Sequence, residues 1–226
     1  MSDNKVKIKV WDVSTRFFHW SMIVLLAALW WTAEEGQMEW HQMCAYTLGA
    51  ILVFRWLWGF IGSETSKFSS FLKSPKRVIE YAKQQKQQSQ FKPHIGHNPL
   101  GGYMVILLML LVSAQFVTGL FASDDIFTEG PLYASVSSGL SEALTWIHRN
   151  LFYLVLGLAV FHVSAVILHT IKGDKLVPAM VTGNKEVSVE SSEPLKFQSA
   201  IASFLLWLIV FAIAGYYFIW PIWQSM

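Results

Sequence analysis

The chain has little charge and almost no cysteine. Only 14% of its 226 residues are charged, whereas 54% are hydrophobic, and the mean hydropathy is +0.40. Because a soluble domain carries about 25% charged residues, this composition argues against a soluble protein. The single cysteine, Cys44, excludes an intramolecular disulfide, a C-x-x-C redox pair and a four-cysteine metal or iron–sulfur site. A net charge of only +2 on so apolar a chain argues against nucleic acid as a partner.

The hydrophobic residues form five runs long enough to cross a bilayer, whose hydrocarbon core takes about 20 helical residues. A helix satisfies its own backbone hydrogen bonds in lipid, and none of the runs shows the alternation of a barrel strand. We therefore expect an all-α integral membrane protein with spans near 17–33, 40–62, 99–122, 143–171 and 197–223. The first four spans form one domain, residues 1–175, and residues 176–226 hold a cytoplasmic linker and the fifth span. The polar loop 63–98 is expected to be partly helical.

Lysine and arginine are confined to alternate loops. All of the 17 basic residues except Arg55 and Arg149 lie in the N-terminal segment, in the 63–98 loop or in the 172–196 linker. Because positively charged loops stay in the cytoplasm, the N-terminus is expected inside and the C-terminus outside. The first run also has features of a secretory signal, but bulky Trp31 stands where a small residue is needed, so we expect this helix to be retained.

Five histidines lie within or at the ends of the expected spans, where an ionisable side chain is costly and commonly functional. His19 is in the first span, His41 in the second, and His148, His162 and His169 are in the fourth. His148 and His162 are fourteen residues apart, which at about 100° and 1.5 Å per residue places them on one helix face, about 21 Å apart in depth. His41 is expected at the depth of His148, and His19 on the side of His162.

Two imidazole pairs at two depths suit two six-coordinate haems, each with axial histidines from facing helices. Since the sequence has no C-x-x-C-H motif, the haems would be non-covalent b-type groups. Spacing alone leaves His169 as an alternative to His162, because it lies seven residues further on the same face. A zinc or copper site would need histidines converging on one point, and a proton path usually includes mid-span carboxylates, which are missing here. His94 and His97 are expected to be solvated or to cap the third long helix.

Several motifs together resemble the bacterial cytochrome b561 and nickel-hydrogenase b-type cytochrome subunit family over about residues 8–175. They are Val10-Trp11-Asp12 with Arg16-Phe17-Phe18-His19-Trp20, the His41-to-Arg55 spacing with Trp56-Leu57-Trp58-Gly59-Phe60, His97-Asn98-Pro99-Leu100-Gly101-Gly102, Gln115 with Thr118-Gly119-Leu120-Phe121, and the His148-to-His162 spacing. The resemblance implies a four-helix di-haem bundle in the bacterial inner membrane. It assigns His41 and His148 to the outer haem and His19 and His162 to the inner haem, with His169 close to a propionate.

Three arginines, Arg16, Arg55 and Arg149, are the candidate partners of haem propionates, because a guanidinium binds a carboxylate through two hydrogen bonds. For Arg16 and Arg149, an equal alternative is that the side chain reaches to lipid headgroups. The fifth span carries no histidine and departs from the four-helix pattern of the family. We expect it to pack against the core or against a partner subunit.

The resemblance implies electron transfer across the membrane between the quinone pool and a periplasmic c-type cytochrome, hydrogenase or reductase. The acidic outer loop with Asp124, Asp125 and Glu129 could attract a lysine-rich c-type cytochrome, or it could be a solvated loop. One alternative is a superoxide:quinone oxidoreductase of the same family. Another is a non-haem membrane anchor or transporter subunit, which would bind no haem. A homo-oligomer is compatible with the sequence.

Overall fold

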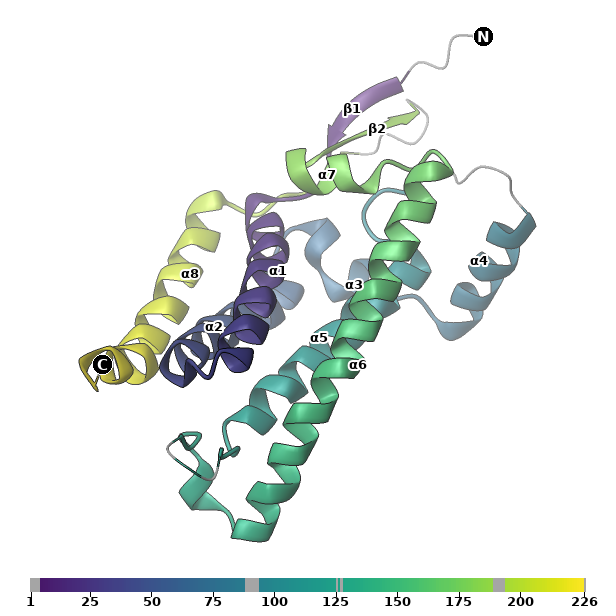
Figure 1. The fold of residues 1–226 in the computed structure, drawn as a ribbon. Helices are drawn as coiled ribbons and strands as arrows, with labels where there is room; N and C mark the ends of the chain where they lie inside the picture. Colours follow the sequence, from purple (N-terminus) through teal and green to yellow (C-terminus); the bar gives the residue numbers. More distant parts are fainter. Residues whose placement is uncertain (1–4, 88–93, 125, 127, 189–193, 226) are drawn as a thin grey trace.

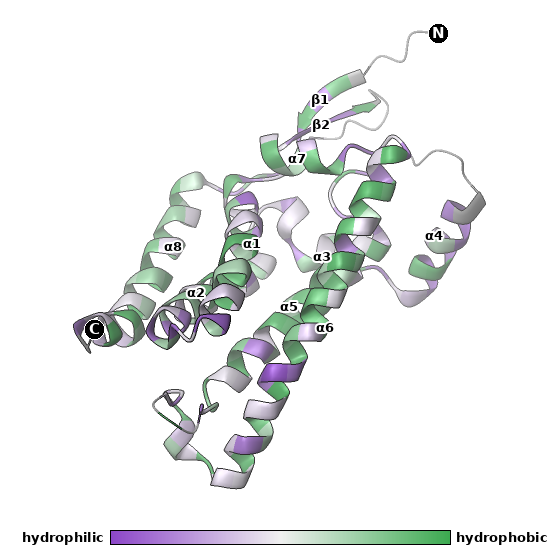
Figure 2. Ribbon diagram, viewed as in Figure 1, coloured by the Kyte–Doolittle hydropathy of each residue, from purple (hydrophilic) through white to green (hydrophobic). Residues whose placement is uncertain are grey.

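The computed structural model shows a helical chain and describes residues 5–87, 94–124, 126, 128–188 and 194–225. Its long helices are α1 (Val13–Glu34), α2 (Met38–Ile61), α5 (Pro99–Gly119) and α6 (Ser138–Ile171). The last span combines α8 (Ala200–Ala214), the π-helical turn η4 (Gly215–Ile219) and α9 (Trp220–Ser225). These five segments are long and apolar enough to cross a membrane, and Figure 2 shows them hydrophobic along most of their length. The prediction of a multi-pass helical membrane protein is confirmed.

Local capping signals set the helix boundaries. The Asp12 carboxylate accepts a hydrogen bond from the Thr15 backbone N–H at 2.6 Å, so α1 begins at Val13 rather than at residue 17. Ser137 caps α6, which begins five residues before the expected position and has 34 residues. At about 1.5 Å per residue α6 is about 51 Å long, well beyond the roughly 30 Å of a hydrocarbon core. Helix α6 is therefore longer than a straight crossing of the hydrocarbon core requires.

The connecting segments are more ordered than the sequence indicated. The 63–98 loop contains η1 (Glu64–Ser66), α3 (Phe68–Phe71) and α4 (Pro75–Gln87), which confirms its partly helical character. The 172–196 linker contains α7 (Leu176–Thr182) and β2 (Asn184–Ser188), and β2 pairs antiparallel with β1 (Lys5–Lys9). In the register of this sheet Ile8 lies opposite Lys185. The sheet, which sequence reasoning missed, joins the linker to the N-terminal segment.

The two ends of the bundle differ (Figure 1). The sheet and α7 cover one end, which we call the sheet end, and the α5–α6 hairpin reaches furthest at the other, which we call the hairpin end. The hairpin loop contains η2 (Tyr133–Ser135) and a bridge between Ser123 and Glu129. Helix α1 packs mainly on α2, and α6 mainly on α5, with the central α2 also contacting α5 and α8. The main buried cluster comes from these helices: Met22, Leu48, Ile51, Leu52, Val112 and Val155.

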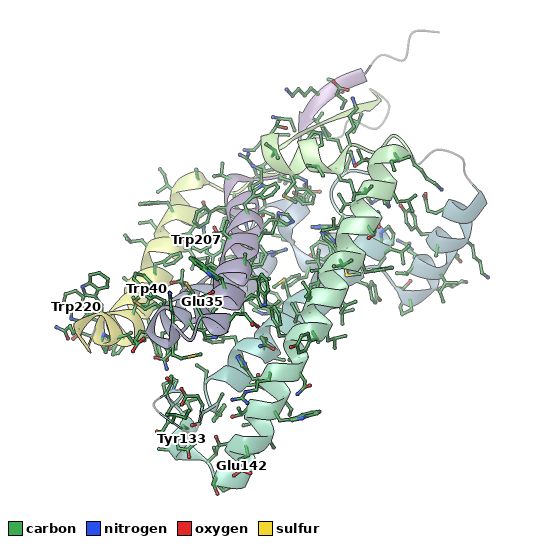
Figure 3. The ribbon with its side chains drawn as sticks, in the orientation of Figure 1. Glu35, Trp40, Tyr133, Glu142, Trp207 and Trp220 are labelled. Atoms are coloured by element: carbon green, nitrogen blue, oxygen red, sulfur yellow. The ribbon has the colours of Figure 1, made fainter. Side chains whose placement is uncertain are left out.

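The fifth span packs against α2 through an aromatic stack. Trp207 of α8 lies parallel to Phe54, with ring centres 3.7 Å apart and planes 12° apart, and it meets the edge of Phe17 in α1. Figure 3 shows Trp207 turned toward the other helices. The π-helical turn that follows α8 includes Tyr217, whose carbonyl would clash with the ring of Pro221 in a regular α-helix. The span thus continues past a proline.

Candidate functional site

The structure brings four of the predicted histidines together as two pairs. In the distal pair, at the hairpin end, the ring centres of His41 (α2) and His148 (α6) are 6.4 Å apart, with planes at 83°. In the proximal pair, nearer the sheet end, those of His19 (α1) and His162 (α6) are 6.5 Å apart, with planes at 56°. The imidazole facing His19 is therefore that of His162.

Both ring separations match two imidazoles bound to one metal ion. A metal–imidazole bond is about 2 Å long and the nitrogen lies about 1.1 Å from the ring centre, so two trans ligands have centres about 6.2 Å apart. Stacked rings lie closer, as Phe54 and Trp207 do at 3.7 Å. Within the described part of the chain no three His, Cys, Asp or Glu residues cluster as metal ligands. The donor set therefore fits a metal that brings its own equatorial ligands, as haem iron does.

Backbone carbonyls fix both rings of the distal pair. His41 Nδ1 donates to the Leu29 carbonyl at 2.9 Å, and His148 Nδ1 donates to the Gln115 carbonyl at 2.8 Å. Because a carbonyl only accepts, each Nδ1 carries the proton, and each Nε2 keeps its lone pair for a metal. The Gln115 side-chain amide also donates to the His148 carbonyl at 2.8 Å, which ties α5 to α6 at this depth.

Glycine lets α5 approach the distal pair. A Cβ added to Gly119 would lie 2.8 Å from Cε1 of His148, and one added to Gly49 of α2 would lie 2.5 Å from Phe116. A side chain at either position would displace a ring. The Gln115 and Thr118-Gly119 motif thus has a local explanation, because its members hold the His148 ring and leave room for it.

At the proximal pair, some buried polar atoms find no hydrogen-bond partner in the described part of the chain. His19 Nδ1 is buried and has no hydrogen-bond partner among the described residues. Arg55 of α2 is only 1% exposed, and its guanidinium lies 5.8 Å from the Phe18 ring centre and 5.2 Å from that of Phe68. Its Nη1 also has no partner within the described ranges. A buried cation is costly without an anion, so Arg55 fits a haem propionate.

Of the other two predicted arginines, one binds a backbone carbonyl near the sheet end and the other is exposed at the hairpin end. Arg16 Nη1 donates to the Val181 carbonyl of α7 at 2.6 Å. Arg149 is exposed and lines a small cavity of about 180 Å³ at the hairpin end, where Figure 3 labels Tyr133 and Glu142. The cavity is also lined by Ser138, Ser141, Thr145 and Trp146. Of the three arginines, Arg55 is the one whose charge is buried within the bundle.

Comparison with known proteins identifies the family. The family model of the prokaryotic cytochrome b561 matches residues 10–183. The chain belongs to the prokaryotic cytochrome b561 family. It is thus a membrane b-type cytochrome of electron transfer, and membership implies b-type haem. The matched region holds both histidine pairs and Arg55, and it ends before α8. No curated protein and no solved structure gives a significant match.

One histidine of this cytochrome b561 lies where sequence reasoning did not expect it. His97 was expected to be solvated or to cap α5, but its ring lies between Trp11 and Phe71, with centres 4.7 and 4.8 Å away. Asn98 caps α5 instead, accepting from the Gly101 backbone N–H at 2.7 Å. His94, three residues earlier, is exposed, as expected.

His97 lies beside the proximal pair. Burial first, and then the charge of Arg55, lowers the pKa of His97 to about 3, so its ring is neutral. His162 and His19 also act electrostatically on this ring. In the sequence, His97 belongs to a family motif. The motif does not indicate in which direction its side chain points.

His169 contacts the sheet end. Its Nδ1 lies 3.4 Å from Oδ2 of buried Asp174, whose Oδ1 binds Lys185 Nζ at 2.5 Å. Lys185 also donates to the His94 carbonyl at 2.9 Å. Burial alone would raise the pKa of Asp174, but hydrogen bonds from His169 and Lys185 outweigh it, and the pKa is lowered. This network joins the end of α6 to β2 and to the loop before α5.

A second buried carboxylate, that of Asp12, anchors the start of α1. Besides capping Thr15, it accepts from Trp58 Nε1 at 3.0 Å and from Ser66 Oγ at 3.1 Å. Burial alone would raise the pKa of Asp12, but hydrogen bonds from Ser63, Thr15 and Trp58 outweigh burial and the pKa is lowered. The Val10-Trp11-Asp12 and Trp58 motifs therefore meet in one contact, which fixes α1, and with it His19, against α2.

Proposed function

We propose that this protein is a di-haem b-type cytochrome that carries electrons across the bacterial inner membrane between the quinone pool and a periplasmic redox partner. The observation that carries the proposal is the pair of facing histidines at each of two depths, with ring centres 6.4 and 6.5 Å apart. One helix, α6, contributes to both pairs, and its two histidines are about 21 Å apart along the axis. Two haems at these depths would therefore divide the path of an electron through a hydrocarbon layer of about 30 Å.

Each residue has a specific role in this proposal. His41 and His148 hold the distal haem, and His19 and His162 hold the proximal haem. The bound haem supplies one-electron redox chemistry. Each histidine pair would hold the iron of one haem through two imidazole nitrogens, an arrangement that would favour electron transfer over oxygen chemistry. The carbonyls of Leu29 and Gln115 hold the Nδ1 protons of the distal ligands, which keeps these rings neutral and correctly oriented.

The charges at the two ends support an orientation. Basic residues gather toward the sheet end, on β1, β2, α4 and the adjoining loops. The hairpin end carries Glu35, Glu129 and Glu142, of which Figure 3 labels Glu35 and Glu142. By the positive-inside rule, the sheet end faces the cytoplasm and both the hairpin end and the C-terminus face the periplasm. The acidic hairpin end would attract a basic partner such as a c-type cytochrome. Asp125 lies outside the described residues.

The first test is an absorption spectrum of the detergent-purified protein, oxidised and then reduced with dithionite, with haem quantified per chain. We expect two b-type haems per chain that are low-spin in both states. One haem would mean that one of the pairs is not a haem site. A folded, haem-sufficient preparation without haem would support the anchor or transporter interpretation and overturn the proposal.

The quinone linkage needs a separate test, because haem binding does not establish it. A soluble quinol added to the oxidised protein should reduce the haems, and their absorbance follows the reaction. If dithionite reduces both haems and quinol reduces neither, the di-haem part of the proposal stands and the quinone part fails.

A further inference from the structure

Beside the proximal pair, two buried nitrogens from separate elements have no hydrogen-bond partner among the residues that the structure describes. One is Arg55 Nη1 on α2, and the other is His97 Nδ1 in the loop before α5. Each buried N–H without an acceptor costs about 1–3 kcal/mol. One aromatic cluster connects them: Arg55 lies over the Phe68 ring, Phe68 packs on Phe71, and Phe71 flanks His97. A single acceptor in this region could therefore serve both nitrogens.

We propose that His97 is a haem-binding residue, whose Nδ1–H donates a hydrogen bond to the same propionate carboxylate that Arg55 binds. This inference rests on the proposed function, because it requires a haem between His19 and His162. A carboxylate suits both donors, since its two oxygens accept about four hydrogen bonds in total. A second metal ion at His97 is disfavoured by the neighbouring charge of Arg55.

Two buried carboxylates of the described part of the chain, Asp12 and Asp174, are already bound to other groups. Asp12 is an electrostatic neighbour of Arg55, but its oxygens already accept from Thr15, Trp58 and Ser66. Asp174 is bound to Lys185 and His169. A carboxylate carried by a ligand would satisfy Arg55 and His97 without displacing any of these bonds.

The His97 ring is held in place before any ligand binds. Trp11 and Phe71 flank it, and the residues on either side of it are fixed. The His94 carbonyl accepts from Lys185, and the Asn98 side chain is held by the Gly101 N–H. A donor fixed in this way loses little conformational entropy on binding.

Two substitutions separate the hydrogen bond from packing. His97→Phe keeps an aromatic ring between Trp11 and Phe71 but removes the donor, whereas His97→Asn places an amide N–H near the position of Nδ1. The matched control is His94→Phe, which changes an exposed histidine in the same loop. All three are made in the full chain, and haem per chain is counted before each redox titration.

We expect His97→Phe to keep two haems and to shift the reduction equilibrium of the proximal haem about tenfold toward the oxidised form, which is about 59 mV for one electron. The reason is that a propionate with fewer donors keeps more negative charge near the iron, which stabilises the ferric state. His97→Asn should restore most of the shift, and His94→Phe should cause none. The distal haem should not respond. A His148→Ala background, which retains the proximal haem, identifies which potential moves.

Several results would overturn the proposal: an unchanged or raised proximal potential, an equal shift of both haems, or an Asn variant that behaves like the Phe variant. Loss of the proximal haem in His97→Phe with retention in His97→Asn would support it, whereas loss in both would indicate packing alone. Failure of the proposed function itself would be visible earlier, as a wild-type protein with fewer than two haems.

Discussion

The distal and proximal pairs share ring spacing and one supporting helix, but they differ in what surrounds them. In the distal pair both Nδ1 atoms bond to backbone carbonyls, and glycine gives α5 room beside His148. In the proximal pair His19 Nδ1 has no partner in the described part of the chain, and Arg55 and His97 gather beside it. The backbone thus fixes the distal site, whereas side chains from several elements shape the proximal one. We expect positive charge from Arg55 to favour reduction at the proximal site.

The largest expected effect comes from removing one histidine ligand of the distal haem. His41→Ala should reduce the haem content from two per chain to one, because the remaining imidazole cannot hold the iron from both sides. Pyridine haemochrome quantification measures the content, and a redox titration should then show only the proximal component. Loss of both haems together, or of neither, would contradict the pairing. Replacing His169 should leave both haems in place, because its ring contacts Asp174.

A subtler change should disturb the distal site alone. Gly119→Ala puts a methyl group 2.8 Å from the His148 ring, and overpacking of this kind costs about 1–3 kcal/mol. We expect partial loss or partial high-spin character of the distal haem by electron paramagnetic resonance, with the proximal signal unchanged. Gly157→Ala on α6 is the matched control, because nothing lies within 4 Å of its Cβ position. An equal effect of both changes would point to general helix perturbation.

Removing the charge of Asp174 tests the sheet end. Asp174→Asn leaves Lys185 buried without its anion, and breaking a buried pair in this way costs about 3–5 kcal/mol. We expect a lower thermal midpoint of the purified protein. The control is Glu186→Gln, which changes an exposed acid on the same strand as Lys185. It should have little effect on the thermal midpoint.

The ion pair of Asp174 and Lys185 also predicts that the stability of the protein depends on pH. Because the pKa of Asp174 is lowered from 3.8, its stabilising contribution is complete above that pH and is lost as the pH falls through the native pKa. Thermal midpoints measured at decreasing pH should therefore converge between wild type and Asp174→Asn. A gap that stays constant on acidification would show that the carboxylate charge is not the cause.

The anchor of α1 can be weakened by removing a single hydrogen bond. Trp58→Phe removes a hydrogen bond to the ionised Asp12, worth about 1.5–3 kcal/mol, and should loosen the proximal site more than the distal one. Trp56→Phe is the matched control on the same helix, since its indole donates to the neutral hydroxyl of Ser113 and should cost about 1 kcal/mol. Thermal unfolding, followed separately at each haem band, compares the two. If both variants lose the same stability, the charge of Asp12 does not strengthen its hydrogen bond with Trp58.

Features with a local physical cause could be predicted from the sequence. The five spans follow from the need to fill a hydrocarbon layer, and the common face of His148 and His162 follows from the helix period. The short sheet was missed although Val6, Ile8 and Val10 alternate with lysines, because a strand also needs a partner. That partner, β2, lies about 180 residues away in the chain, where no local signal connects the two.

The sequence by itself determined the helical membrane fold and the identity of the residues that could hold haem, because hydropathy and helical spacing act over short distances along the chain. Spacing left His162 and His169 equivalent, and only the tertiary structure turned one toward His19 and the other toward Asp174. The burial of Arg55 and of the His97 Nδ1 atom was likewise decided by the meeting of α2, the loop before α5 and the N-terminal segment. Side-chain direction and burial depend on contacts between distant segments, which no local pattern in the chain encodes.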